Sequence, residues 1–220
     1  MKLKLLLSAI LSLPKSIYLN LQSLPFSSAI KLPILIHYNT KLNDLSGIVK
    51  FEGTPRFCCV KFGFTGSYSL GMGGGYWSNS GMITFNQKAS FARGTQLICG
   101  KYGQIVFGHN FESNANCIFN AGTSISFGDN CLLSWNISLL DGDGHKIIMN
   151  NEYDESPKDS SIIIGDHVWI CMNSVILKGA HIGDNSVIAS NSTVNKKINM
   201  SNVLIAGVNK VTKSNINWIK

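Results

Sequence analysis

The chain has 220 residues, of which 45% are hydrophobic and only 14% are charged, and 21 are glycine. Average globular proteins carry about 25% charged residues, so these values exclude a coiled coil and a charge-rich disordered chain. No window reaches the ~18–20 uninterrupted apolar residues of a membrane span. The formal charge is +7, but the basic residues are scattered and not interleaved with aromatics, so we expect no nucleic-acid partner.

The N-terminus begins like a signal peptide, with Lys2 and Lys4 ahead of a short apolar run over 5–13. Pro14-Lys15 follows directly, where a small-x-small cleavage site would be required. We therefore expect a retained apolar helix over 1–30, broken near Pro14 and Pro25. Two uses of this helix stay open, namely peripheral contact with a membrane and docking against the rest of the chain.

Six cysteines are present, and Cys58 and Cys59 are adjacent while the others show no paired metal-ligand spacing. Cysteine used as a small apolar residue is typical of a reduced compartment. We therefore expect a cytoplasmic protein. We also expect no metal requirement.

A strict period of six residues is the clearest feature of the chain. Aliphatic residues recur at Ile164, Ile170, Ile176, Ile182 and Ile188. A helix needs apolar residues three and four apart and a plain strand needs every second one, so neither fits. A short strand followed by a tight turn does fit.

The fourth position of each repeat suits a left-handed backbone conformation, which Gly, Asn and sometimes His tolerate. The same frame continues upstream through Phe85, Phe107 and Phe127. The expected turn residues are Gly94, Gly100, Asn110, Asn116, Gly122, Asn130, Asn136, His167, Asn173, Gly179, Asn185 and Asn191.

Grouped in threes, the repeats make about five coils, and every extra residue falls after the third unit. These coils predict a mainly β protein, a triangular parallel β-helix with about eighteen residues per coil. We expect the β-helix domain over 85–220, with a loop at 140–163 and a short C-terminal helix. The segment 1–84 is expected to form a helical and irregular-strand unit packed on the first coil.

Several stretches resemble the left-handed β-helix, hexapeptide-repeat acyltransferases. They begin at Ile164, Val175, Ile182 and Ile205, and the loop Asp141-Gly-Asp-Gly-His145 belongs with them. Within that family the chain is similar to sugar and polysaccharide O-acetyltransferases of the galactoside, maltose and capsule types. The resemblance implies a left-handed helix and acetyl transfer from acetyl-CoA to a saccharide hydroxyl, in capsule, lipopolysaccharide or other surface polysaccharide synthesis.

Acyl transfer to an alcohol requires a base, because a hydroxyl is a poor nucleophile until its proton is removed. His145 supplies an imidazole at the start of the longest interruption of the repeat. Asp141 or Asp143 can accept the second ring N–H and orient the base. Which one does so stays open, a backbone carbonyl would also serve, and Asp-Gly-Asp-Gly as a plain solvated turn is the alternative.

The resemblance places Asn114 where related enzymes hold an active-site amide that positions the acceptor or the oxyanion. It also places Trp169 near the reaction centre, and we assign Trp169 and Asn136 to substrate binding. Asparagine is abundant in the repeat and a tryptophan can simply pack at a corner, so structural roles remain the alternative.

Acetyl-CoA, the acyl donor, is implied by resemblance to lie along the outside of the helix between subunits of a homotrimer. The matching positions on this chain are Met172, Gly179, Ser190, Lys196 and Lys210.

Three other functions would fit parts of this pattern. A zinc enzyme on the same solenoid would use His109, His145, His167 and His181, but their spacing does not match. A non-catalytic solenoid would show flat Thr or apolar ladders. The nearest rival is N-acetylation of a nucleotide-linked amino sugar.

Overall fold

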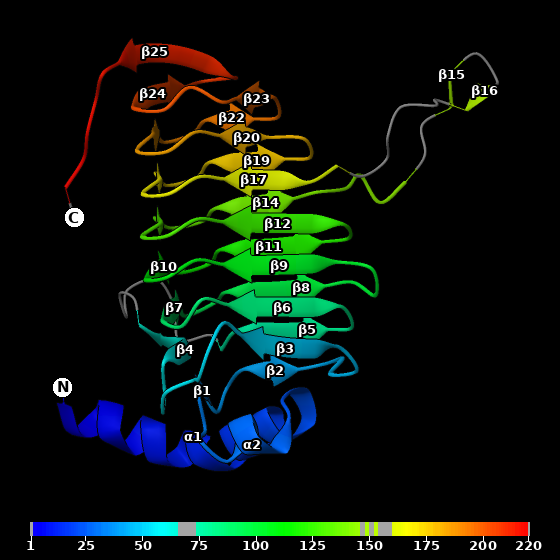
Figure 1. Ribbon diagram of the computed structural model, residues 1–220, viewed down its shortest axis with the longest axis vertical. Coiled ribbons are helices and arrows are strands. Elements are labelled where there is room, and N and C mark those ends of the chain that lie inside the picture. The colour runs from blue at the N-terminus through cyan, green and yellow to red at the C-terminus, as the bar shows by residue number, and fades with distance from the viewer. Residues whose placement is uncertain (1, 66–73, 146–147, 150–151, 154–159, 220) are drawn as a thin grey trace.

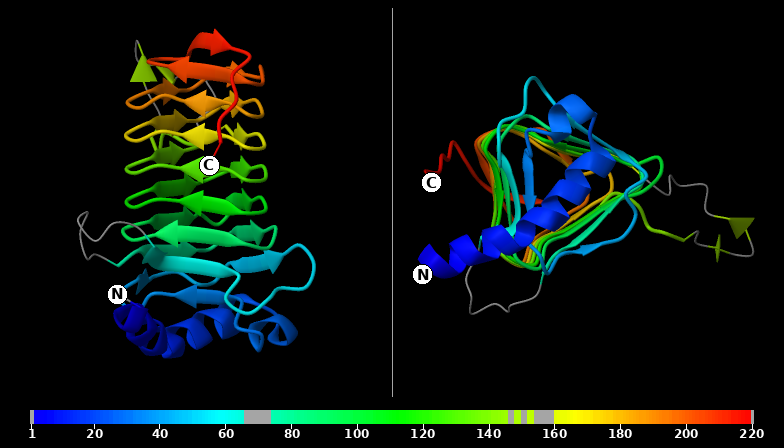
Figure 2. Two further views of the ribbon diagram at one scale, coloured as in Figure 1. Left: turned by 90° about the vertical axis from the view of Figure 1, so that its left-hand side faces the viewer. Right: turned by 90° about the horizontal axis from the view of Figure 1, so that it is seen from below.

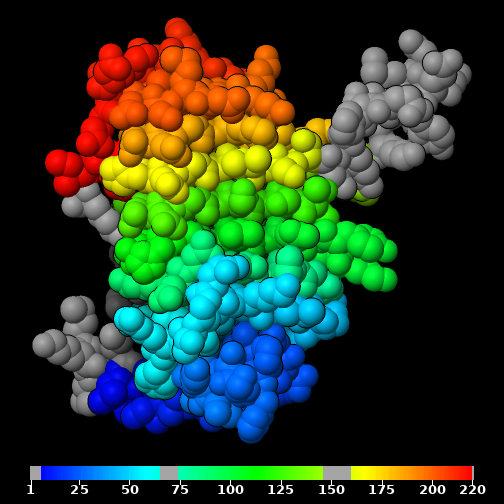
Figure 3. Space-filling view, viewed as in Figure 1, coloured from blue at the N-terminus to red at the C-terminus, as the bar shows by residue number. Residues whose placement is uncertain are grey.

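The computed structural model describes residues 2–65, 74–145, 148–149, 152–153 and 160–219. Parallel strands wind into a three-sided column, and two helices close its N-terminal end (Figure 1). Seen from that end, the chain runs counterclockwise as it recedes from the viewer (Figure 2), so the coil is left-handed. Successive segments follow one another along the long axis in the space-filling view (Figure 3). The predicted left-handed triangular β-helix is confirmed.

Each coil contributes one strand to each of three sheets, and all neighbours within the column pair in parallel except the last pair, β24 and β25. Sheet A contains β1 (Ile34–Ile36), β4 (Val60–Thr65), β7 (Ala89–Ala92), β10 (Phe111–Ser113), β13 (Leu132–Leu133), β18 (Trp169–Ile170), β21 (Val187–Ile188), β24 (Val203–Ala206) and β25 (Lys210–Ser214). Sheet B contains β2 (Lys41–Leu42), β5 (Tyr76–Asn79), β8 (Gln96–Cys99), β11 (Ile118–Ala121), β14 (Ser138–Leu140), β19 (Val175–Leu177) and β22 (Thr193–Val194). Sheet C contains β3 (Ile48–Phe51), β6 (Met82–Phe85), β9 (Gln104–Phe107), β12 (Ser124–Phe127), β17 (Ile162–Ile164), β20 (His181–Ile182) and β23 (Lys197–Ile198). We name the corners after the sheets they join, in chain order: A–B, B–C and C–A.

The fourth positions of the repeat form the A–B and C–A corners, and Gly179 takes the same left-handed conformation on the B–C corner, with a φ of 76°. Asn110, Asn130 and His167 on the C–A corner have φ values of 56°, 58° and 53°. Side-chain amides stack from coil to coil, as where Asn110 Nδ2 donates to Asn130 Oδ1 at 3.2 Å. Gly100, which lies on the B–C corner, is absent from this left-handed set, so the prediction was wrong there. Gly122, on the same corner, departs in the same way.

The first position of each repeat points into the column and is buried. In the C-terminal coils it is aliphatic, as at Ile170, Ile176 and Ile188, which have no exposed surface. In the middle coils it is aromatic, and Phe107 stacks between Phe85 and Phe127 with ring centroids 5.4 and 5.6 Å apart. Burial of these rings supplies the main hydrophobic stabilisation of the column.

The column begins earlier than the repeat predicts. Strands β1 to β5 lie upstream of the first predicted repeat, at Phe85 in β6, and β23 follows the last one, so sheets B and C hold seven strands each and not about five. Their register continues directly into the later coils, since Phe85 of β6 is paired with both Phe51 and Phe107. The division at residue 84 stays a prediction about folding units.

Helix α1 (Lys2–Ser23) runs through Pro14 and is not broken there, which corrects the expected break. Its side chains cover the bare edge of β1: Ser16 Oγ accepts from Ile36 N at 3.0 Å, and Asn20 pairs with both N and O of Ile34 at 3.2 and 2.7 Å. An uncovered strand edge exposes unpaired backbone groups. The helix therefore docks on the first coil, with α2 (Phe26–Ala29) beside it.

The expected short C-terminal helix is wrong. Residues Lys210–Ser214 form β25, which pairs antiparallel with β24 and closes the last coil. The tail then turns back along sheet A, where Trp218 Nε1 donates to the backbone oxygen of His167 at 2.8 Å. A strand suits this segment because β24 would otherwise have an unpaired edge.

The cysteines are free thiols, and Cys117 and Cys131 are buried in the column. Burial raises the pKa of each of these two thiols to about 12, so both stay protonated near neutral pH. Within the described residues, no helix is long and apolar enough to span a bilayer.

Candidate active site

The longest insertion between strands of the column lies between β14 and β17 at the B–C corner, and its strands β15 (Ile148–Met149) and β16 (Glu152–Tyr153) stand away from the column (Figure 1). These two strands pair as a two-stranded antiparallel ribbon. His145 lies at the start of the insertion with an exposed side chain. The candidate base therefore stands at a corner of the column, open to a substrate or to a neighbouring chain.

The two candidate orienting carboxylates have different environments. Asp141 is 1% exposed, and its two oxygens accept hydrogen bonds from the backbone N–H groups of Gly122 and Thr123 at 2.7 and 2.8 Å. Asp143 is exposed and forms an ion pair with Lys178. Among the described residues, no hydrogen bond joins His145 to either carboxylate. Asp141 thus fixes the start of the insertion to the coil below.

Asn114 lies at a different corner, A–B, directly after β10. Its Nδ2 donates to the backbone oxygen of Leu133 at 3.3 Å, which holds the half-buried amide against the next coil. Asn136, assigned to substrate binding, lies on the same corner as a rung of the asparagine ladder. Its amide accepts from Asn116 at 3.3 Å and donates to Asn173 at 3.1 Å.

Four of the five positions predicted to bind acetyl-CoA lie on the same two corners, and the fifth lies on β25. Met172 and Ser190 lie on the A–B corner, on coils above Asn114, and both are exposed. Gly179 and Lys196 lie on the B–C corner, on coils above His145. Lys210 is exposed on β25.

Sheet B separates these two groups within one chain. A–B residues and B–C residues stand at opposite ends of the same strands, such as β14 between Asn136 and Asp141. One copy of the chain therefore does not bring His145 and Asn114 together. An A–B corner of one copy placed against a B–C corner of another would do so.

Trp169 points outward from sheet A and is packed, not open. Its Nε1 donates to Ser134 Oγ at 3.1 Å. Trp218 of the returning tail lies 5.8 Å from the Trp169 ring and stacks on His167, with ring centroids 4.2 Å apart and planes at 12°. These contacts fit the packing role that the sequence left as the alternative, and the assignment of Trp169 to substrate binding stays a prediction.

The other histidines considered as zinc ligands do not come together at one site in the described part of the chain. His109 and His167 lie on the C–A corner, whereas His181 is on β20 of sheet C. No group of three His, Cys, Asp or Glu side chains placed to hold a metal ion is found among the described residues.

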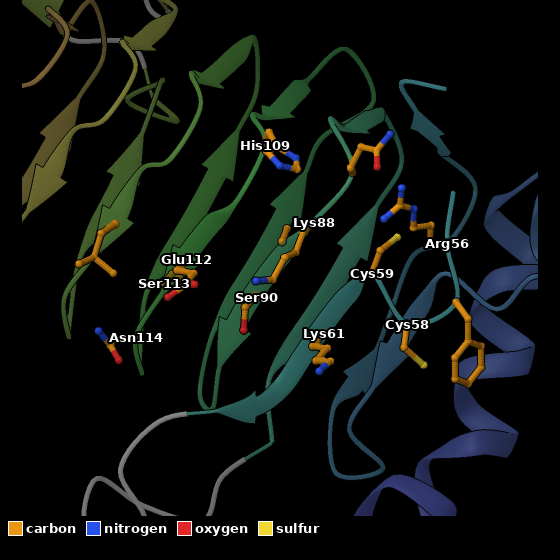
Figure 4. A pocket seen from close by; sticks show the side chains of 14 residues that line it. Arg56, Cys58, Cys59, Lys61, Lys88, Ser90, His109, Glu112, Ser113 and Asn114 are labelled. Carbon is orange, nitrogen blue, oxygen red and sulfur yellow. The ribbon is translucent and has the colours of Figure 1, made fainter. Parts of the chain in front are cut away.

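The outer face of sheet A carries a hollow of about 560 Å³ that was not predicted from the sequence. It extends from the loop 52–59 to Asn114, and Figure 4 shows its side chains on neighbouring strands. The lining residues are Arg56, Phe57, Cys58, Cys59, Lys61, Gln87, Lys88, Ala89, Ser90, His109, Glu112, Ser113, Asn114 and Leu132. The sequence gives no local signal for it, because strand pairing assembles it from residues far apart in the chain.

Residues 161–196 match the family model described as bacterial transferase hexapeptide (six repeats). This part of the chain is therefore similar to the hexapeptide repeats of bacterial transferases. Galactoside O-acetyltransferase of Escherichia coli K12 is 40% identical over 111 residues, which are 49% of this chain and 52% of that protein. A candidate lipopolysaccharide biosynthesis O-acetyl transferase of the same organism, WbbJ, is 28% identical over 142 residues, 60% of this chain and 71% of that protein.

Among solved structures, the polySia specific acetyltransferase NeuO matches with a TM-score of 0.55 and 19% identity, covering 83% of each chain. At this identity the match concerns the fold of the hexapeptide-repeat chain alone. The chain spans about half the length of the galactoside O-acetyltransferase it matches.

Proposed function

We propose that this protein is an acetyl-CoA-dependent O-acetyltransferase that transfers an acetyl group to a saccharide hydroxyl in the synthesis of a surface polysaccharide, in the cytoplasm. The observation that carries the proposal is His145, exposed at the start of the longest insertion of the column, which Asp141 anchors to the coil below. The similarity to named sugar O-acetyltransferases supports the choice of donor and acceptor.

In the proposed reaction the acceptor oxygen attacks the thioester carbonyl carbon while the imidazole of His145 takes the hydroxyl proton. The carbon–sulfur bond then breaks, the acetyl group remains on the saccharide oxygen, and the proton passes from the imidazole to the thiolate of CoA. The Asn114 amide donates toward the oxygen that becomes negative as the tetrahedral centre forms. Asp141 acts as a positioning residue that fixes the insertion.

The proposed site is shared between copies of the chain. If the B sheets of three copies face a common axis, each A–B corner meets the B–C corner of the next copy, and such a heterologous contact closes into a ring. Met172 and Ser190 from one copy, with Gly179 and Lys196 from the next, would then line one cleft for acetyl-CoA above the reacting groups. Lys210, on the last coil, would meet the phosphates.

The release of free CoA thiol from acetyl-CoA, measured against a panel of saccharides, tests this function. We expect release that depends on the acceptor and a product that carries an alkali-labile acetyl ester. An alkali-stable amide product would instead identify an N-acetyltransferase. Acetyl-CoA binding without release on any saccharide would contradict the O-acetyltransferase proposal.

We further propose that α1 contacts an anionic lipid surface. The side of the helix away from β1 exposes large apolar residues, including Leu7, Ile10 and Leu11 at 51%, 53% and 62%. The helix contains no acidic residue, and lysines stand at positions 2, 4 and 15, of which Lys15 donates to the backbone oxygen of Thr40 at 2.7 Å and belongs to the docked side. An apolar face next to basic residues is typical of helices that lie in the interface of an anionic membrane.

Deleting residues 1–30 would uncover the edge of β1, so surface substitutions are the sharper test. We expect the double variant Ile10→Ser, Leu11→Ser to float several-fold less with phosphatidylglycerol vesicles than the unmodified protein. The matched control Ile163→Ser, Met200→Ser changes residues of similar exposure, 43% and 54%, elsewhere on the column. Equal flotation of both double variants, or loss of assembly instead of flotation, would show that this face does not bind lipid.

A further inference from the structure

We propose that the outer face of sheet A is a binding trough for an acidic oligosaccharide, the acceptor that receives the acetyl group. This inference rests on the proposed function and adds to it the chemical class of the acceptor. Neither the repeat nor the family match assigns a role to this face.

The floor of the trough is a column of outward-facing residues aligned by strand register. Lys61 pairs with Ser90, Ser90 with Glu112, and Glu112 with Leu132. Neighbouring strands lie about 4.8 Å apart, so these four rungs span roughly 14 Å along the column. This length suits several linked sugar rings better than one.

The trough has fixed ends and sides. The loop 52–59 closes its lower end and is held by the backbone, since Cys58 N donates to Leu32 O at 3.0 Å. Lys88 and His109 lie along the C–A corner, whereas Asn114 ends the opposite side at the A–B corner. The lower hollow alone has a volume typical of ligand sites.

A second hollow of about 380 Å³ continues the first toward the C-terminal coils. The two hollows share Lys88 and Glu112, so they form one continuous trough. The second ends at His167 and Trp218, where the returning tail packs on the column. Phe57, which is 67% exposed, gives the lower end an aromatic ring of the kind that stacks on sugars, whereas Trp218, which is 8% exposed, closes the upper end by packing on His167.

The charge of the lower hollow is predominantly positive. Arg56, Lys61 and Lys88 line it together with a single carboxylate, that of Glu112. The structure gives none of these three cations an ion-pair partner within the residues it describes. Cationic side chains lining a concave surface attract an anionic ligand. Carboxylated sugars spaced along a chain match this pattern.

The position of the trough favours the acceptor over the donor. Arg56, Lys61 and Lys88 lie on coils before Asn114, whereas the positions proposed for acetyl-CoA lie on coils after it. An oligosaccharide in the trough would reach Asn114 from the N-terminal side. The donor would reach the same residue from the C-terminal side.

The test is binding in the absence of acetyl-CoA, with oligogalacturonate and alginate oligomers as acidic probes and a malto-oligosaccharide of equal length as the neutral probe. We expect the acidic probes to bind more tightly, and added salt to remove the difference. The double variant Lys61→Gln, Lys88→Gln should weaken acidic binding roughly tenfold and leave neutral binding unchanged. The control Lys50→Gln, Lys213→Gln removes the same charge from exposed sites outside the trough.

Equal affinity for acidic and neutral probes, or equal loss in the control variant, would overturn the proposal. A raised KM for acetyl-CoA with unchanged oligosaccharide binding would assign the lysines to the donor phosphates instead. Binding is measured without turnover, so it tests the trough separately from the reaction. If the protein binds acidic probes but releases no CoA, the transferase function is contradicted and the trough proposal stands.

Discussion

Replacing His145 by alanine should lower acceptor-dependent CoA release by about 10²–10⁴, the contribution of a general base in other enzymes. The loss should lie in kcat, because the imidazole acts on the proton that moves during attack and not on ground-state binding. His145→Gln should fail equally, since an amide keeps a hydrogen-bonding group but takes no proton. The measurement is the initial rate of thiol release at saturating acetyl-CoA.

Stability serves as the control for this comparison. His145 is exposed and belongs to the insertion, so neither substitution should change the thermal unfolding of the column beyond the ~0.5 kcal/mol usual for surface sites. A His145→Ala protein that folds and turns over as fast as the unmodified chain would remove the base from the mechanism. The transferase assignment would then need another proton acceptor.

Replacing Phe107 by alanine should lower the free energy of unfolding by about 3–5 kcal/mol, the range for deleting a buried aromatic ring. Phe107 has no exposed surface and its ring contacts those of Phe91, Phe111 and Phe119 at 4.9, 4.7 and 5.6 Å, as well as the two stacked neighbours on sheet C. The cavity would open in the middle of the column, where neighbouring coils depend on each other. We expect a Tm lower by roughly 10 °C.

Tyr102→Ala is the matched control, because this ring is 82% exposed on the B–C corner next to the same strand. It should change stability by no more than ~0.5 kcal/mol. Both variants must be compared at one protein concentration, since assembly contributes to apparent stability. A Phe107 variant as stable as the Tyr102 variant would show that the aromatic stack is not what holds the middle coils.

The inward-facing positions and the turn positions of the column could be predicted because each coil repeats the same strand followed by the same tight turn. A residue such as Ile170 must face inward, and Asn173 must take a left-handed turn, whatever lies above or below. The first two coils could not be found this way. The loop over 52–59 and the ten residues between the end of β4 and the start of β5 shift the period between Ile36, Phe62 and Phe85.

The unbroken course of the helix at Pro14 and the strand at the tail were missed for related reasons. Pro14 breaks a helix when its partner carbonyl is left unsatisfied, but tertiary contacts of Ser16 and Asn20 hold α1 on the first coil. The tail becomes a strand because β24 offers it an edge. Both outcomes depend on contacts between segments and not on local sequence.

For the candidate site, residue types were predictable and their arrangement was not. His145 and Asn114 follow from chemistry and family resemblance, but only the fold places them on different corners. The trough depends on strand register, which aligns Lys61, Ser90 and Glu112 although 22 or more residues separate each from the next.

The shared site is the central claim, and mixing two inactive proteins tests it most directly. His145→Ala and Asn114→Ala should each be nearly inactive alone, yet co-refolded in equal amounts they should form sites in which both groups are intact. Random assortment in a closed ring predicts about a quarter of the unmodified activity. A mixture no more active than its components, while size-exclusion chromatography shows mixed assemblies, would mean that the site does not combine His145 and Asn114 from different copies.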